Sequence, residues 1–281
     1  MSKISVAVIQ MSPSGDRENN LSHAATLLAE SAERGATLAI LPEMFSALVP
    51  AAQWRQTAER QGGAVEAFLT ETARKHRMYI VGGSYVEAAD GGRFFNTCPV
   101  FAPDGSVLGR YRKMHLFWTD IKGATRYDER SYLAAGDSQL VFNAAGFAVT
   151  VGICYDLRFP EFFRKPLGRV PDLCCLPAAF MHATGKAHWE TLVKARAIEN
   201  LAYFAAAGTV GRHYEVAGRP GEFVETWGHS MLVSPWGNAV AETADGEGVA
   251  VGEITHEAIV QARGKLAALD HMRDDLWRTR G

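Results

Sequence analysis

Long apolar runs are absent from this 281-residue sequence, and none approaches the roughly 20 residues that a transmembrane helix needs. The first residues alternate apolar and polar, and no small-residue cleavage site follows, so we expect no signal peptide. Cysteine is scarce: of the four, Cys98, Cys174 and Cys175 are expected to be small buried hydrophobes. No Cys-x-x-Cys pair and no zinc-finger spacing occurs. These absences predict a cytoplasmic protein with reduced thiols and no structural metal.

A strong charge of either sign is also missing. Lys and Arg number 29 and Asp and Glu 31, which leaves a net charge of -2. Such a chain has no basic field to attract nucleic acid or anionic lipid, so we expect neither as a partner. Glycine-rich phosphate loops and the Gly-x-Ser-x-Gly elbow are absent as well. What remains is an ordinary globular composition, 47% hydrophobic and 21% charged, in a chain long enough to bury a core without disulfides.

Short β-rich runs alternate with amphipathic stretches along the chain. The patterns predict strands and helices in alternation: strands at 4–10, 37–41, 78–86, 149–154, 172–176 and 204–210, and helices at 21–34, 65–76 and 184–203. A further helix is expected to begin at Glu161 behind Pro160, and Thr184 is expected to cap the longest helix. Turns at 103–105 and 235–237 close two hairpins. This alternation favours one α/β domain over the whole chain, 1–281.

Cys154 closes the apolar run 149–154 and stands just before an expected helix start. A side chain at a sharp strand-to-helix turn is exposed, and the backbone N–H groups from Tyr155 onward can face whatever the sulfur attacks. A free thiol, with a pKa of about 8.5, needs a base or a positive neighbour to react at neutral pH. Position alone leaves two interpretations equally open, a nucleophile and a core cysteine.

Two charged residues and several histidines could supply that base or charge. Glu43 follows the buried strand 37–41, and the carboxyl end of a strand is a good place for a site, although a surface-loop glutamate is the alternative. Lys113 lies on a β-like run that continues to residue 117, and alone it indicates only a strand-edge charge. A papain-like dyad stays open with any of several histidines: His115, His182, His188, His213 and His229.

Three segments taken together resemble the signature blocks of the nitrilase, or carbon–nitrogen hydrolase, superfamily, and they occur in the same order. They are Leu-Pro-Glu-Met-Phe at 41–45, Tyr-Arg-Lys-Met-His-Leu-Phe at 111–117 and Gly-Ile-Cys-Tyr-Asp-Leu-Arg-Phe-Pro-Glu at 152–161. The resemblance extends from Val6 to about Trp277. It implies an α-β-β-α sandwich, with two sheets packed face to face and helices outside.

The resemblance also implies catalytic residues and a mechanism without a metal or an organic cofactor. Glu43 corresponds to the family's general base, Lys113 to its oxyanion donor and Cys154 to its nucleophile. A second glutamate, ahead of a Leu-x-x-Gly-Asp segment in many members, corresponds to Glu129, for which a solvated surface charge is the alternative. The thiolate attacks an amide carbon, Lys113 and the backbone N–H after Cys154 stabilise the oxyanion, ammonia leaves, and water hydrolyses the thioester.

The closest branch of the superfamily contains the omega-amidases and the amidases of deaminated glutathione. Segments 82–84, 96–98, 115–117 and 227–230 resemble omega-amidases, which act on α-ketoglutaramate and α-ketosuccinamate, whereas Gly211-Arg212-His213 resembles the sister group. Arg158 could bind the distant carboxylate of such a substrate, or form a structural ion pair with Asp156 or Glu161. The resemblance places several other residues at the pocket: His115, Tyr155, Phe180 and Thr184.

The sequence departs from omega-amidases between His115 and Glu129. Trp118 stands where an aspartate is usual, and Lys122-Gly123 where a Pro-Gly turn is usual, so the pocket could be narrower. An N-carbamoyl-amine hydrolase, a true nitrilase and an inactive binding protein on the same fold therefore remain alternatives. By resemblance we also expect a homodimer or a higher homo-oligomer, with a carboxyl-terminal tail at 265–281 that contacts the partner.

Overall fold

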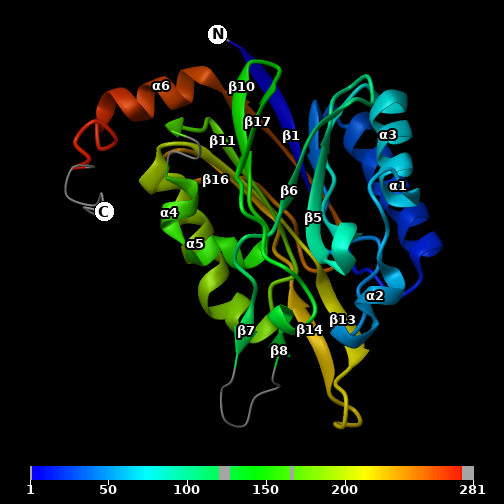
Figure 1. Cartoon of the computed structure of the whole chain (residues 1–281). Coiled ribbons are helices and arrows are strands. Elements are labelled where there is room, and N and C mark those ends of the chain that lie inside the picture. Colours follow the sequence, from blue (N-terminus) through cyan, green and yellow to red (C-terminus); the bar gives the residue numbers. More distant parts are fainter. Residues whose placement is uncertain (1, 120–126, 165–167, 274–281) are drawn as a thin grey trace.

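The computed structural model describes residues 2–119, 127–164 and 168–273. Its helices are α1 (Arg17–Glu33), α2 (Trp54–Thr57), α3 (Ala64–His76), α4 (Pro160–Phe163), α5 (His182–Asn200) and α6 (His256–Lys265). Two β-sheets pack face to face; α1 and α3 cover the outer face of one, and α4 and α5 that of the other (Figure 1). The expected α-β-β-α sandwich is therefore confirmed. None of the helices in the described ranges combines the length and apolarity of a membrane span.

The first sheet contains seven strands in the order β17-β1-β2-β3-β5-β4, with β6 paired to β5. The strands are β1 (Lys3–Gln10), β2 (Leu38–Ile40), β3 (Tyr79–Val81), β4 (Tyr85–Ala88), β5 (Phe94–Phe101), β6 (Val107–Arg112) and β17 (Gly248–Thr255). Strands β1, β2 and β3 are parallel, so their carboxyl ends meet at one edge of the sheet. Glu43 follows β2 and comes to lie at that edge.

The second sheet has six strands in the order β16-β15-β12-β11-β10-β9. They are β9 (Leu140–Ala144), β10 (Phe147–Val151), β11 (Leu173–Ala178), β12 (Tyr203–Gly208), β15 (Met231–Val233) and β16 (Ala239–Glu242). Two ribbons, β7 (Trp118–Thr119) with β8 (Tyr127–Asp128) and β13 (Val210–Glu215) with β14 (Phe223–Trp227), extend at the end of the sandwich where α2 lies (Figure 1). Strands β10, β11 and β12 are parallel, and Cys154 follows the carboxyl end of β10.

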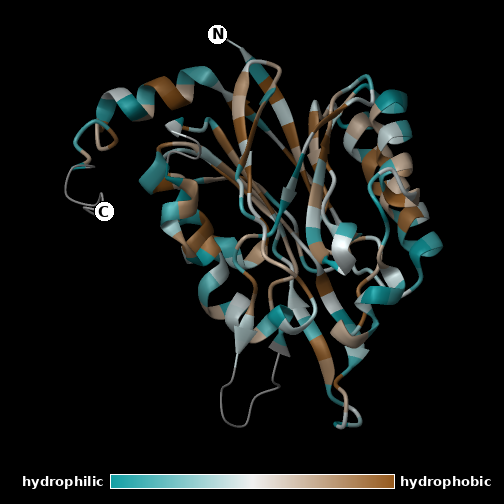
Figure 2. Ribbon diagram, viewed as in Figure 1, coloured by the Kyte–Doolittle hydropathy of each residue, from teal (hydrophilic) through white to brown (hydrophobic). Residues whose placement is uncertain are grey.

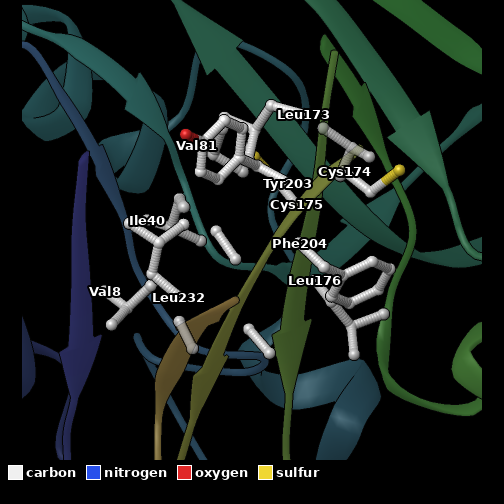
Figure 3. Close-up of a cluster of buried hydrophobic side chains, with 14 of the residues drawn as sticks. Val8, Ile40, Val81, Leu173, Cys174, Cys175, Leu176, Tyr203, Phe204 and Leu232 are labelled. Carbon is white, nitrogen blue, oxygen red and sulfur yellow. The ribbon is translucent and has the colours of Figure 1, made fainter. Parts of the chain in front are cut away.

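Strand β1 is apolar on both faces because it is covered on both faces. Val6 and Val8 belong to the core between the sheets, whereas Ala7 and Ile9 pack toward α1 and α3. Figure 2 shows the same division, with apolar residues along the central strands and polar residues on the outer faces of the helices. Figure 3 shows side chains of both sheets meeting in the inter-sheet core, including Cys174 and Cys175. The three cysteines expected to be buried are buried.

Several predicted boundaries are wrong for local reasons. The strand expected at 78–86 is two strands, because Gly82 and Gly83 turn the chain between β3 and β4. The strand expected to reach Cys154 ends at Val151, and the helix expected from Glu161 is the single turn α4. Thr184 does not cap α5: the cap position is Met181, and the Thr184 hydroxyl donates to the Met181 carbonyl at 3.2 Å. The tail prediction falls partly on residues 274–281, which lie outside the described residues.

The inter-sheet core predicts a large cost for truncating Leu176, whose side chain is fully buried (Figure 3). Leu176→Ala removes buried methyl groups and leaves a cavity, so it should lower the free energy of unfolding by about 2–5 kcal/mol. Val260 on α6 is 58% exposed, so Val260→Ala is the control and should change stability by less than about 0.5 kcal/mol. Urea unfolding followed by circular dichroism measures both; equal midpoints for the two variants would contradict the packing described.

Candidate active site

A cavity opens where the carboxyl ends of the parallel strands of both sheets meet. Its walls contain eight of the residues predicted from the sequence: Glu43, Lys113, Glu129, Cys154, Tyr155, Arg158, Phe180 and Thr184. The remaining wall is mostly apolar and comes from α2, the ribbon β13–β14 and the segments that follow Glu43, Lys113 and β11. A mostly apolar cleft with a few convergent polar groups is the usual form of a small-molecule site.

Cys154 is held in a conformation that few residues adopt. Its φ is 45°, in the left-handed region, and it begins a short 3-10 turn, Cys154–Arg158. Asp156 fixes this turn, because its buried carboxylate accepts the backbone N–H of Ile153 at 2.7 Å. A strained residue between a strand and a turn lifts its side chain off the sheet, as in other nucleophile elbows.

The same carboxylate joins the Cys154 turn to the segment that carries Lys113. Asp156 accepts the hydroxyl of Tyr111 at 2.6 Å, and His115 Nδ1 lies 2.7 Å from its other oxygen. The Tyr111 hydroxyl in turn accepts the backbone N–H of Met114. Asp156 thus holds the nucleophile and the lysine segment in one fixed relation.

Glu43 is positioned by a tight approach of two chain segments. The next residue, Met44, has φ 53°, and its N–H donates to the buried Ser84 hydroxyl at 3.0 Å. A Cβ on Gly83 would lie 2.3 Å from the Pro42 carbonyl oxygen, so only glycine permits this approach. The segment 82–84, noted for its resemblance to omega-amidases, therefore fixes the turn that presents Glu43.

Three donors converge on the Glu43 carboxylate. Lys113 Nζ and Asn96 Nδ2 donate to Oε1 at 2.9 and 2.8 Å, and the Ala179 backbone N–H donates to Oε2 at 2.8 Å. The Cys154 thiol also hydrogen-bonds to this carboxylate. These bonds fix both oxygens of Glu43 beside the thiol.

Lys113 is fully enclosed and bridges two carboxylates. Its Nζ donates to Glu43 and to Glu129 Oε1, both at 2.9 Å, and Glu129 Oε2 accepts the Phe117 backbone N–H at 2.7 Å. Contrary to the expected β-like run, strand β6 ends before Lys113, whose backbone is held by Asn96 and Gly136. An ammonium has three N–H donors, so two are used and one remains for a bound oxyanion.

Electrostatics keeps the resting thiol neutral. Burial raises the pKa of Cys154 well above its usual value, and the nearby Glu43 charge raises it further. Burial opposes the charged form of Lys113, but Glu129 and Glu43 outweigh burial and raise the pKa of this lysine. Burial, reinforced by the Glu43 charge, raises the pKa of Glu129. Burial and the Glu43 charge both favour the protonated thiol of Cys154, with the Glu43 carboxylate beside it as the nearest acceptor for its proton.

Arg158 is the cavity's unused cation. It forms no ion pair with Asp156, Glu161 or any other residue in the described ranges, and its guanidinium lies 5.1 Å from the Phe180 ring centroid. The expected alternative, a structural ion pair, is thus not formed within that part of the chain. A planar guanidinium with free donors can bind a carboxylate through two parallel hydrogen bonds.

Other predictions fail at the site. His115 does not line the cavity: besides binding Asp156, it stacks on Phe159 with centroids 3.8 Å apart. No histidine of the described residues lines the cavity, so the papain-like dyad is not formed there. Trp118 is 48% exposed and stands outside the lining, while Lys122-Gly123 lies outside the described residues.

Sequence reasoning missed two contributions. Asn96 belongs to a segment that resembles omega-amidases, with no role expected for it, yet its amide donates directly to Glu43. The rest of the cavity lining was not predicted, because it comes from segments that are distant in the sequence. It consists of Met44, Leu48, Trp54, Phe117, Met181, Tyr214, Val224 and Thr226. No periodicity or spacing signals such a wall. Among the described residues, no group of three or more His, Cys, Asp or Glu could hold a metal ion.

The family model for carbon–nitrogen hydrolases matches residues 5–264. The chain belongs to this family. It is 37% identical over 277 residues to the omega-amidase NIT2 of Danio rerio, covering 99% of this chain and 97% of that protein. It is 34% identical over the same length to the omega-amidase NIT2 of Homo sapiens, covering 99% and 98%. The predicted family is confirmed, and the protein is an enzyme that hydrolyses amides through a cysteine.

Solved structures agree with this assignment. Nit3 of Saccharomyces cerevisiae, a member of branch 10 of the nitrilase superfamily, superimposes with a TM-score of 0.82 at 29% identity over 94% of each chain. A carbon–nitrogen hydrolase superfamily protein of Xanthomonas campestris, solved with an arsenic adduct in its active site, gives 0.84 at 28% identity, covering 97% and 98%. The shared fold extends over nearly the whole chain.

Removing the Lys113 ammonium tests the arrangement. Lys113→Met removes the expected oxyanion donor and should lower kcat by about 10²- to 10³-fold. It also leaves two buried carboxylates without their cation, so the free energy of unfolding should fall by roughly 3–5 kcal/mol. Lys194, which forms a surface pair with Glu190, provides the control variant Lys194→Met. Near-normal ammonia release from folded Lys113→Met would show that backbone N–H groups alone hold the oxyanion.

Proposed function

We propose that this enzyme is an omega-amidase, which releases ammonia from the terminal amide of an α-keto acid such as α-ketoglutaramate. The observation that carries the proposal is the unpaired guanidinium of Arg158 in the same cavity as Cys154. A substrate with an amide at one end and a carboxylate at the other can place the amide at the thiol and the carboxylate on Arg158. The named activity of the NIT2 relatives supports the same substrate class.

The first half of the reaction forms a thioester. Glu43 accepts the thiol proton as the Cys154 sulfur bonds to the amide carbon, and the carbonyl oxygen becomes an oxyanion. The free N–H of Lys113 and the Tyr155 backbone N–H stabilise that oxyanion. Glu43 then gives its proton to the nitrogen, the carbon–nitrogen bond breaks, and ammonia leaves. Glu129 keeps Lys113 in place throughout.

The second half hydrolyses the thioester. Water attacks the thioester carbon and gives a proton to Glu43, and the same donors stabilise the second oxyanion. The carbon–sulfur bond then breaks, and Glu43 returns the proton to Cys154. The products are the free dicarboxylic acid and the original enzyme, so no step needs a cofactor.

The predicted alternatives within the family differ in substrate, and nothing specific in the cavity favours them. Of the motif that resembles deaminated-glutathione amidases, Arg212 pairs at the surface with Glu225, and His213 binds Thr226 and the Pro13 carbonyl. Neither Arg212 nor His213 lines the cavity. Ammonia release from keto-acid amides, N-carbamoyl compounds and nitriles, measured in one panel, separates these activities from the proposed one.

We further propose one domain, a cytoplasmic location and a homodimer in which the tail 265–281 contacts the partner. Support for the dimer comes from exposed apolar side chains that no described segment covers. Ile198 on α5 and Trp236 in the β15–β16 turn are 47% and 53% exposed, and Leu266 after α6 is 46% exposed. Lys265 Nζ lies 5.9 Å from the Trp236 ring centroid, which brings the start of the tail to this surface.

The nucleophile is tested by Cys154→Ala. Alanine tolerates the left-handed backbone about as well as cysteine, so we expect an unchanged unfolding midpoint and no detectable ammonia release. Cys174→Ala, which removes a buried thiol near the start of β11, is the control and should keep wild-type kcat. Retention of a tenth of the activity by Cys154→Ala would assign the nucleophile to another residue.

The substrate class is tested by Arg158→Lys. Lysine keeps the charge but loses the planar fork, so kcat/KM for α-ketoglutaramate should fall about 10- to 100-fold. The fall should be much smaller for a neutral aliphatic amide. Arg219 is half-buried, pairs with Glu222 and does not line the cavity, so Arg219→Lys is the control. An equal loss on both substrates would mean that Arg158 serves the scaffold.

A further inference from the structure

The ribbon β13–β14 contains an irregularity beside the cavity. Arg212 pairs with Glu225 and Glu215 pairs with Phe223, so two residues of β13, His213 and Tyr214, lie opposite the one residue between those partners on β14. Two residues opposite one is the arrangement of a β-bulge. A bulge changes the direction of side chains and is frequent next to active sites. Figure 1 shows the ribbon extending from the sandwich at the end where α2 lies.

The bulge changes which side chains face the cavity. Regular alternation after the exposed Arg212 would turn Tyr214 to the solvent side, together with Arg212. With the extra residue, Tyr214 lines the cavity beside Val224 and Thr226 of β14. The ribbon is anchored to the cavity wall by the Met181–Thr226 bridge, so this placement is fixed.

The Tyr214 hydroxyl is a polar group without a partner. His213 is bonded to Thr226 and the Pro13 carbonyl, and the Thr184 hydroxyl donates to Met181, whereas Tyr214 makes no hydrogen bond within the described residues. Burial raises the pKa of Tyr214 to about 12. The phenol therefore remains protonated and able to donate throughout the neutral range.

Three polar side chains that line the cavity make no hydrogen bond within the described residues: Arg158 and Tyr155 on the turn that begins at Cys154, and Tyr214 on the ribbon β13–β14. Tyr214 is the one of the two phenols that does not neighbour Cys154 in the chain. If Arg158 takes both oxygens of a carboxylate, the polar atom next to it in a 2-oxo acid is the keto oxygen, an acceptor that needs a donor. A cavity that provides such a donor discriminates against an analogue without the acceptor, because the donor then stays unpaired.

We propose that Tyr214 determines specificity by donating a hydrogen bond to the 2-oxo group of the substrate, so that the site selects omega-amides of 2-oxo acids over the corresponding saturated acids. This inference rests on the proposed function and adds to it, because Arg158 alone would accept any omega-amide with a distal carboxylate.

The test compares α-ketoglutaramate with glutaramate, which has the same length and carboxylate but a methylene in place of the keto group. The wild-type enzyme should have the higher kcat/KM on the keto substrate. Tyr214→Phe keeps the ring and removes the donor, so it should reduce that preference about 3- to 10-fold, mainly through KM. Tyr132 packs on Trp54 but does not line the cavity, so Tyr132→Phe is the matched control and should keep the wild-type preference.

The outcomes separate this inference from the function on which it rests. If the wild-type enzyme prefers both acid amides to a neutral amide but does not distinguish them, or if Tyr214→Phe lowers both equally, the inference is overturned and the omega-amidase proposal stands. If neither acid amide is preferred to the neutral amide, both are overturned. A selective loss on α-ketoglutaramate in Tyr214→Phe alone supports the assignment.

Discussion

The buried ammonium of Lys113 is the interaction on which the site depends. Two carboxylates within 3 Å of one enclosed nitrogen would be prohibitive without it, since like charges removed from water repel strongly. In return, Glu43 and Glu129 keep the lysine charged inside the protein. Glu43, Lys113 and Glu129 are therefore stable in the interior only together. The segments that carry them must pack against one another.

The topology of the sandwich brings these segments together. Parallel strands in each sheet direct their carboxyl ends to one edge, and packing the sheets face to face brings the two edges together. Glu43 then arrives from one sheet and Cys154 from the other. Short local devices complete the alignment: Gly83 permits the close approach beside Glu43, and Asp156 ties the nucleophile turn to the lysine segment.

The gathering of Glu43, Lys113 and Cys154 at one cavity could be predicted from sequence because these residues lie in continuous blocks with fixed neighbours. Glu43, Lys113 and Cys154 each sit within a motif whose backbone geometry is local. His115 shared such a block, but its ring binds Asp156 and faces away from the cavity, because a motif specifies a segment without specifying where each side chain points. The position of Tyr214 at the cavity depends on a register shift between two strands, and no local pattern in this sequence predicts that shift.

Some polar groups of the cavity are hydrogen-bonded within the protein, and others are open to a substrate. Around the reacting atoms, Glu43, Glu129 and two donors of Lys113 are already occupied by partners within the protein, so their positions do not depend on which substrate enters. Groups fixed in this way lose little freedom during the reaction, which is the condition for strong stabilisation of an oxyanion. The cavity-lining groups left open are Tyr155 and Arg158, on the turn that begins with Cys154, and Tyr214, on a ribbon outside the sheets. Because Arg158 and Tyr214 take no part in the bonds among Glu43, Lys113 and Glu129, the substrate range of this fold can change at those two positions while that arrangement stays the same.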